Sequence, residues 1–126
     1  MYYHYTFKTY KGKSSLKYRE FKDRLESEFK QIAKDKGVEL LGCNILEDHV
    51  HLLIQQALSD STDYVMRMFK GISSRRFFRE YPSNRLVDRK LWGRGYFTRK
   101  VSEEDLPKVK AYIKDQIGPD GYDKRY

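Results

Sequence analysis

The segment 38–55 constrains the fold of this chain more than any other part of the sequence. It reads "VELLGCNILEDHVHLLIQ" and consists of two apolar runs of strand length, 38–46 and 49–55, around the pair Glu47-Asp48. Two such runs joined by a tight turn predict an antiparallel hairpin. Helical patterns flank the hairpin on both sides, so strands and helices alternate along the chain.

The order of the patterns predicts an α+β fold. The expected elements are a strand over 2–10, a helix capped at Ser14 or Ser15 and ending at Gly37, the two hairpin strands, a helix capped within 59–61 and ended by Pro82, a strand over 91–101, and a last helix over 102–117. The first six match the ferredoxin-like or RRM-like plan, a split βαβ antiparallel sheet with its helices on one face. In this plan the first and third strands are central, and an extra helix follows.

Two of the three histidines of the chain lie on one face of the predicted third strand. Side chains alternate along a strand, so His49 and His51 point the same way, while Val50, Leu52 and Ile54 point into the core. The histidines then lie on the face that the two helices leave open. A divalent metal ion needs three or four ligands, so a metal site here requires partners for them.

The last predicted helix offers those partners. Tyr112 and Gln116 are four residues apart and share a stripe of its surface. If the helix crosses the open face of the sheet, the Gln116 amide oxygen completes a His-His-Gln set, with the Tyr112 hydroxyl beside the ion. A phenol next to a cation is a usable nucleophile for phosphoryl transfer. Glu47 has the strand parity of the histidines and would add a further ligand if the strand extended that far, although a place in the turn is favoured.

Positive charge is concentrated in residues 67–100. This window holds eleven of the 26 Lys and Arg residues and two of the 18 acids, which accounts for the whole net charge of +8. Seven aromatic residues lie in the same window. Although each aromatic taken singly is expected in the core, the block as a whole predicts a surface that binds phosphates and unpaired bases.

Length and composition narrow the class of protein further. The 126 residues suit one domain over 1–126, with a short tail over 118–126. The single cysteine, Cys43, excludes an intramolecular disulfide and fits a reducing compartment. No apolar run approaches the ~20 residues of a membrane span, and the first residues lack a signal-peptide core. A cytoplasmic protein without membrane contact is therefore expected.

Four blocks of the sequence resemble the IS-two-hundred-like transposases, the single-tyrosine, His-hydrophobic-His transposases of small prokaryotic insertion sequences. The blocks are "DHVHLLIQ" (48–55), "MFKGISSRRFFREYP" (68–82), "LWGRGYFTRKV" (91–101) and "VKAYIKDQ" (109–116). They occur in the order and at about the spacing of the family, and the resemblance covers residues 2–117.

The resemblance implies an active site and a reaction. His49, His51 and Gln116 would bind Mg²⁺ or Mn²⁺, and Tyr112 would be the nucleophile. In such enzymes the tyrosine attacks single-stranded DNA and leaves a 5′-phosphotyrosine link and a free 3′-OH. Family members recognise a subterminal DNA hairpin. They are homodimers in which the tyrosine helix of one subunit can complete the histidine site of the other.

The resemblance also implies that the basic window 67–100 contacts the DNA, and it assigns no function to His4 or to the tyrosines of the tail. The residues expected to contact DNA are Lys70, Arg75, Arg76, Arg79, Arg94 and Arg99. The first strand is richer in tyrosine than the family pattern, so His4 is assigned no function. Tyr122 and Tyr126 in the tail lack a glutamine four residues on and are not favoured as nucleophiles.

Three other functions compete with this one. A histidine-triad hydrolase needs a third histidine at alternate spacing, and position 53 is Leu53. A non-catalytic RRM-like module that binds single-stranded nucleic acid needs exposed aromatic residues on the central strands. A purely structural domain, with both histidines buried in its core, is the third alternative. Removing two neighbouring imidazole rings from water without ligands costs free energy, so this function is the least favoured of the three.

Overall fold

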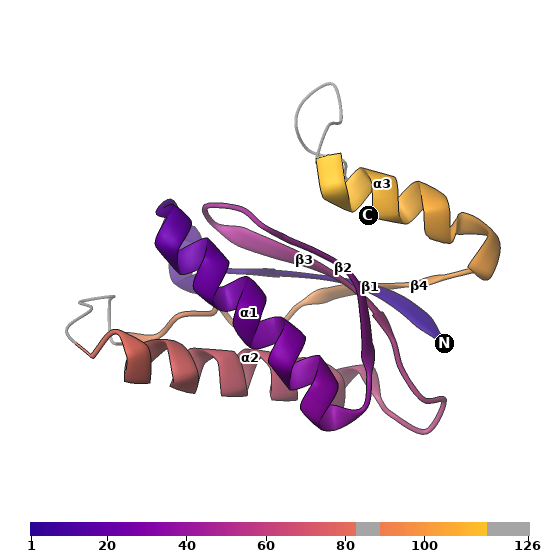
Figure 1. Cartoon of the computed structure of the whole chain (residues 1–126), viewed down its shortest axis with the longest axis horizontal. Coiled ribbons are helices and arrows are strands. Elements are labelled where there is room, and N and C mark those ends of the chain that lie inside the picture. Colours follow the sequence, from indigo (N-terminus) through magenta and orange to yellow (C-terminus); the bar gives the residue numbers. More distant parts are fainter. Residues whose placement is uncertain (83–88, 116–126) are drawn as a thin grey trace.

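One antiparallel sheet separates two helical layers in the computed structural model, which describes residues 1–82 and 89–115 (Figure 1). The elements are β1 (Tyr2–Lys8), the 3-10 turn η1 (Tyr10–Gly12), α1 (Arg19–Lys36), β2 (Glu39–Ile45), β3 (His49–Gln55), α2 (Thr62–Glu80), β4 (Phe97–Val101), the 3-10 turn η3 (Glu103–Asp105) and α3 (Leu106–Asp115). The strand order is β2-β3-β1-β4, so β1 and β3 are central. The predicted split βαβ plan is confirmed.

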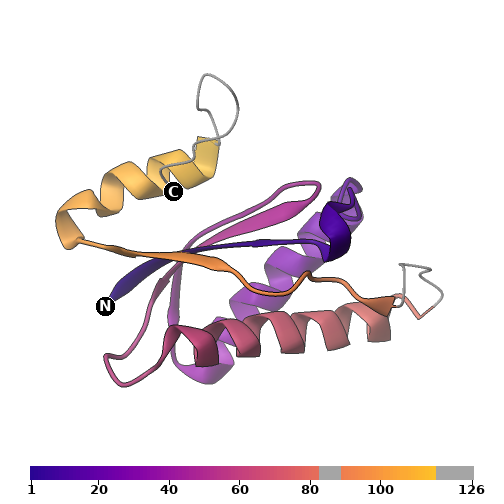
Figure 2. The ribbon, with the colours of Figure 1, turned by 180° about the vertical axis from the view of Figure 1, so that it is seen from behind.

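Different helices pack on the two faces of the sheet. Helices α1 and α2 pack on one face, and α3 lies across the other, as Figures 1 and 2 show from opposite sides. Val50, Leu52 and Ile54 are fully buried in the main core with α1 and α2, as the alternation along β3 predicts. A second, smaller core under α3 is formed by Leu53, Val101, Val109 and Ile113.

The first helix begins later than predicted. α1 starts at Arg19, not at Ser14 or Ser15. The reason is a long-range contact: the Leu16 backbone N–H donates to the carbonyl oxygen of Glu47 at 3.0 Å, and the Leu16 side chain is fully buried. This bond ties the segment before α1 to the β2–β3 turn. The predicted stop is confirmed, because Gly37 ends α1 in the left-handed conformation with φ of 70°.

The last strand is shorter than predicted. β4 begins at Phe97 rather than at residue 91, and Trp92 instead forms an isolated bridge with Thr9. Ser102 caps the following turn, since its hydroxyl accepts from the Asp105 backbone N–H at 3.3 Å. Residues 116 and 117 of the predicted last helix, and the tail, lie outside the described residues. Within 1–82 and 89–115, no helix combines the length and apolar character that a membrane crossing requires.

Candidate active site

Strand β3 presents His49 and His51 beneath α3. Their ring centroids are 5.0 Å apart, with an interplanar angle of 77°. His51 is only 3% exposed, whereas His49 is half-buried. In the register with β1, His49 lies opposite Lys8 and His51 opposite Thr6. The predicted pairing of the two histidines on the face away from α1 and α2 is therefore present in the fold.

Each of these histidines has an outer partner at Nδ1. The Asp48 carboxylate oxygen Oδ1 lies 2.7 Å from His49 Nδ1. His51 Nδ1 lies 2.9 Å from His4 Nε2 and 3.1 Å from the Thr6 hydroxyl oxygen. With both Nδ1 atoms engaged, the Nε2 atoms are the ones that could bind a metal ion. Both Nε2 atoms are buried, and His51 Nε2 has no hydrogen-bond partner among the described residues.

Burial keeps the inner imidazoles neutral at neutral pH. It lowers the pKa of His51 to about 3, with further contributions from His4 and His49. Burial also lowers the pKa of His4 to about 4, and the nearby Arg99 guanidinium adds to this shift. A neutral imidazole is the form that binds metal ions. The buried Nε2 atom of His51 and the neutral rings therefore fit a metal-binding role.

Helix α3 brings Tyr112 to the histidines of the same chain. The Tyr112 ring meets the His51 ring edge-on, with centroids 6.0 Å apart and an angle of 88°. The helix is held by its apolar face and by a side-chain amide on β2, because Asn44 Nδ2 donates to the Ile113 carbonyl oxygen at 2.8 Å. A methyl group added at Gly42 would lie 3.8 Å from Ile113, so β2 and α3 are already in close contact there.

The remaining predicted ligands are not part of the described site. Gln116 lies outside the described residues. Glu47 is exposed in the β2–β3 turn, before β3 begins. No three His, Cys, Asp or Glu side chains come together as an ion site in the part of the chain that the structure describes. A metal at His49 and His51 therefore needs a ligand from another residue type, another segment or the substrate.

The sequence analysis missed His4, which the structure places in the site. His4 is 1% exposed on the central strand β1, and its ring stacks on that of His51 with centroids 5.1 Å apart. Tyr112 lies against it too, with ring centroids 6.3 Å apart. The available signal was strand parity, since Tyr5 and Phe7 in the core put His4 on the opposite face.

The predicted DNA-contacting residues fall into two groups. Arg75, Arg79, Arg94 and Arg99 are exposed. Arg76 forms ion pairs with Glu28 at 3.4 Å and Asp35 at 3.7 Å, which link α2 to α1. Lys70 is half-buried and donates to the carbonyl oxygens of Gly93 at 2.8 Å and Gly95 at 2.7 Å. Arg76 and Lys70 thus have partners within the chain.

Replacing Lys70 with methionine is expected to lower the free energy of unfolding by about 1–3 kcal/mol, because two hydrogen bonds from a charged donor are lost. Chemical denaturation measures this. Arg75→Met on the same helix is the matched control and should stay within about 0.5 kcal/mol of the parent, since Arg75 is exposed. Equal stability of the two variants would mean that the Lys70 contacts add nothing to the fold.

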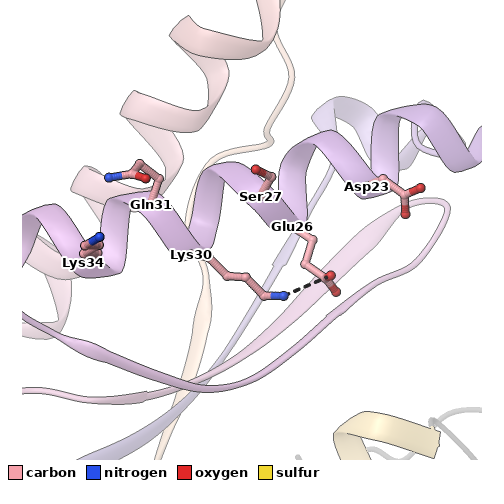
Figure 3. A pocket seen from close by; sticks show the side chains of 6 residues that line it. All are labelled: Asp23, Glu26, Ser27, Lys30, Gln31 and Lys34. Atoms are coloured by element: carbon pink, nitrogen blue, oxygen red, sulfur yellow. Dashed lines mark hydrogen bonds and ion pairs between the residues drawn. The ribbon is translucent and has the colours of Figure 1, made fainter.

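Other surfaces are less suited to catalysis. An open depression along α1 is lined by Asp23, Glu26, Ser27, Lys30, Gln31 and Lys34 (Figure 3). Its one ion pair among these six residues, Lys30–Glu26 at 3.4 Å, is exposed. The depression is therefore a solvent-exposed helix face, on which ion pairs contribute little to the stability of the fold.

The rival functions find less support in this geometry. The large aromatic residues Tyr5 and Phe7 of the central strand β1 are buried in the main core rather than exposed for base stacking. On the opposite face, α3 packs over β2 and β3, and His4 and His51 of the central strands are buried there. Leu53, at the position where a histidine triad needs its third histidine, is fully buried in the small core against α3.

Comparison with known proteins identifies the family. The sequence model of the family described as "Transposase IS200 like" matches residues 1–116. The ISDra2 transposase TnpA of Deinococcus radiodurans is 31% identical over 99 residues, which cover 77% of this chain and 71% of that protein. The crystal structure of a candidate transposase from Deinococcus radiodurans R1 has a TM-score of 0.75 at 28% identity, covering 92% of this chain and 90% of that one.

A second solved structure shows the same fold. A REP-associated tyrosine transposase bound to a REP hairpin has a TM-score of 0.68 at 16% identity, covering 98% of this chain and 70% of that one. The fold and its relatives thus define the class as DNA transposases. The chain belongs to the IS200-like transposase family, which consists of metal-dependent enzymes that cleave and transfer DNA strands.

Proposed function

We propose that this transposase cleaves and rejoins single-stranded DNA at insertion-sequence ends through a 5′-phosphotyrosine intermediate, with Tyr112 as the nucleophile. The observation that carries the proposal is the position of Tyr112 on α3, with its ring centroid 6.0 Å from that of the buried His51. A nucleophile must be held close to the groups that bind the reacting phosphate. The bond from Asn44 to Ile113 supports this position by fixing α3 on the sheet.

The chain's own residues account for the covalent step. The Tyr112 phenolic oxygen attacks the phosphorus of a phosphodiester, an O–P bond forms, and the bond from phosphorus to the 3′ oxygen breaks. The phenol loses its proton, and the leaving oxygen takes one up to become a 3′-OH. The phosphotyrosine link conserves the energy of the broken ester, so rejoining by a 3′-OH requires no nucleotide cofactor.

The proposed ligands for the metal of this family are His49 and His51 through Nε2, with Gln116 as the third. Imidazole nitrogen, amide oxygen and phosphate oxygen together can hold Mg²⁺ or Mn²⁺. When bound there, the ion polarises a phosphate oxygen and so favours attack by a phenol. The His51 Nε2 atom, buried without a hydrogen-bond partner among the described residues, supports this assignment.

The exposed arginines are the proposed DNA contacts, and they lie on two sides of the sheet. Arg99 on β4 is directly opposite His4 on β1, so it shares the face of the histidines and could reach phosphates near the cleaved bond. Arg75 and Arg79 are on α2, on the other side. We assign Lys70 a supporting role, because its two bonds flank the exposed Arg94.

The proposed substrate is a single strand that carries a subterminal hairpin, and the proposed assembly is a homodimer. The contacts of the Tyr112 ring with His4 and His51 of its own chain support a site in which one chain supplies both the tyrosine and the histidines. Exchange of α3 between subunits would give the same site in trans. In either arrangement, each active site needs one Tyr112 and one pair of His49 and His51 at the DNA strand that is cleaved.

The experiment that tests the function is a denaturing gel assay for a covalent protein–DNA adduct. Labelled single strands from both strands of the DNA that flanks the gene are incubated with the protein and Mn²⁺ or Mg²⁺. One strand is expected to give a metal-dependent adduct with its 5′ end on the protein. Binding of hairpin DNA or RNA in mobility shifts, with no adduct under any metal condition, would instead favour the non-catalytic binding module.

A further inference from the structure

His4 and His51 form a buried pair whose geometry gives each ring a distinct role. His4 Nε2 lies 2.9 Å from His51 Nδ1, and both side chains are nearly fully buried. Nδ1 and Nε2 point away from each other on an imidazole ring. The contact with His4 is therefore on the side of His51 that faces away from its Nε2 atom, which is buried and has no hydrogen-bond partner within residues 1–82 and 89–115.

This geometry makes His4 unsuitable as a third ligand for an ion at His51 Nε2. The His4 nitrogen closest to His51 is already within hydrogen-bond distance of the wrong side of that ring. In agreement, His4, His49 and His51 do not come together as an ion site within the described residues. A role for His4 toward that ion would therefore act through His51, whose Nδ1 atom it contacts.

The role follows from the tautomers of the two rings. A neutral imidazole that binds metal through Nε2 carries its proton on Nδ1. His51 Nδ1–H then donates to His4 Nε2, which requires the proton of His4 to be on Nδ1. The Thr6 hydroxyl oxygen, 3.1 Å from His51 Nδ1, is a second contact at the same nitrogen. Such outer partners fix the tautomer and orientation of a metal-binding histidine.

We infer that His4 is a positioning residue that holds His51 in the Nδ1–H tautomer, with Nε2 directed at the bound divalent ion. This inference rests on the proposed function of His51 as a metal ligand. His4 carries out for the buried ligand what the Asp48 carboxylate, 2.7 Å from His49 Nδ1, does for the half-buried one. The two proposed ligands thus differ in the groups that contact their Nδ1 atoms. His49 has an exposed carboxylate, and His51 has a buried imidazole and a buried hydroxyl.

The test compares two substitutions of His4 in the full chain, with Tyr112→Phe as the background so that no DNA chemistry interferes. His4→Phe keeps an aromatic ring but removes the acceptor, whereas His4→Gln keeps an amide acceptor at similar reach. Mn²⁺ affinity is measured by electron paramagnetic resonance of the free ion. His4→Phe should weaken binding about 10- to 100-fold, and His4→Gln should recover most of the loss.

The tautomer itself is a second readout, which a merely structural role would not change. Long-range ¹H–¹⁵N correlation spectra of the histidine rings should show His51 protonated at Nδ1 in the background protein. The population of this tautomer should fall in His4→Phe. An unchanged His51 tautomer together with an unchanged Mn²⁺ affinity in His4→Phe would overturn the inference.

One control separates this inference from the proposed metal site. His51→Ala should weaken Mn²⁺ binding more than His4→Phe does. If His51→Ala binds Mn²⁺ as tightly as the background protein, the metal site is wrong, and the role inferred for His4 falls with it. If His51→Ala weakens binding while His4→Phe does not, the metal site stands and the inference about His4 is wrong.

Discussion

Replacing Tyr112 with phenylalanine is expected to reduce the covalent protein–DNA adduct by at least about a thousandfold, because the change removes the only atom that the proposed mechanism uses as nucleophile. The ring itself remains, so its edge-on contacts with His51 and His4 can persist. The stability of the fold and the binding of hairpin DNA should therefore change little. The measurement is adduct yield on a denaturing gel, together with a mobility shift for binding.

A second tyrosine provides the matched control. Tyr64 is exposed on α2, on the far side of the sheet from α3. Tyr64→Phe also removes one phenolic oxygen and should leave the adduct yield at the parental level. If Tyr112→Phe still forms the adduct in full, the nucleophile lies elsewhere, and the tail tyrosines Tyr122 and Tyr126 become the residues to replace next.

Much of this site could be predicted because it depends on local periodicity. The alternation in "HVHLLIQ" was sufficient to separate the histidines from the core residues of β3, and the structure confirms both faces. Local signals also located helix ends: Ser61 caps α2 by accepting from the Tyr64 N–H at 3.0 Å, and Gly37 ends α1. Such signals work within one turn or one strand.

The errors arose where distant segments decide the local structure. The first helix begins late because Leu16 bonds to Glu47 in the β2–β3 turn. The last strand is short because the segment before it leaves the β1–β4 ladder: Gly95 has a left-handed φ of 75°, and the Lys70 side chain on α2 bonds to the carbonyl oxygens of Gly93 and Gly95. Both contacts join residues that are far apart in the sequence, so they cannot be predicted from the residues around the helix or strand that they affect.

His4 could be placed on the correct face from sequence but not beside His51. Alternation along β1 identifies its face, whereas its neighbours across the sheet depend on the register between β1 and β3. The observed register sets Thr6 opposite His51 and His4 opposite Leu53, which brings the His4 ring diagonally to His51. A shift by one residue would have sent His4 into the main core.

Replacing His51 with alanine is expected to reduce the metal-dependent adduct by at least about a hundredfold, because losing a ligand should cost more than losing an outer partner. Excess Mn²⁺ should restore only a small part of the yield, since a higher concentration offsets weaker binding but does not replace the ligand that holds the ion in position. Adduct yield over a range of Mn²⁺ concentrations measures this. Thermal unfolding and hairpin binding are the controls, because His51 is buried under α3 and its removal leaves a cavity.

The same variant, mixed with Tyr112→Phe, shows whether the site is built from one chain or from two. In the structure, Tyr112 meets the histidines of its own chain. If the working enzyme keeps this arrangement, a mixture of the two inactive variants stays inactive, because no chain carries both groups. If α3 exchanges between subunits, a mixed dimer joins an intact Tyr112 to intact histidines, and part of the adduct returns. Full activity of His51→Ala on its own, or of the parent without any divalent metal, would remove His51 from the mechanism altogether.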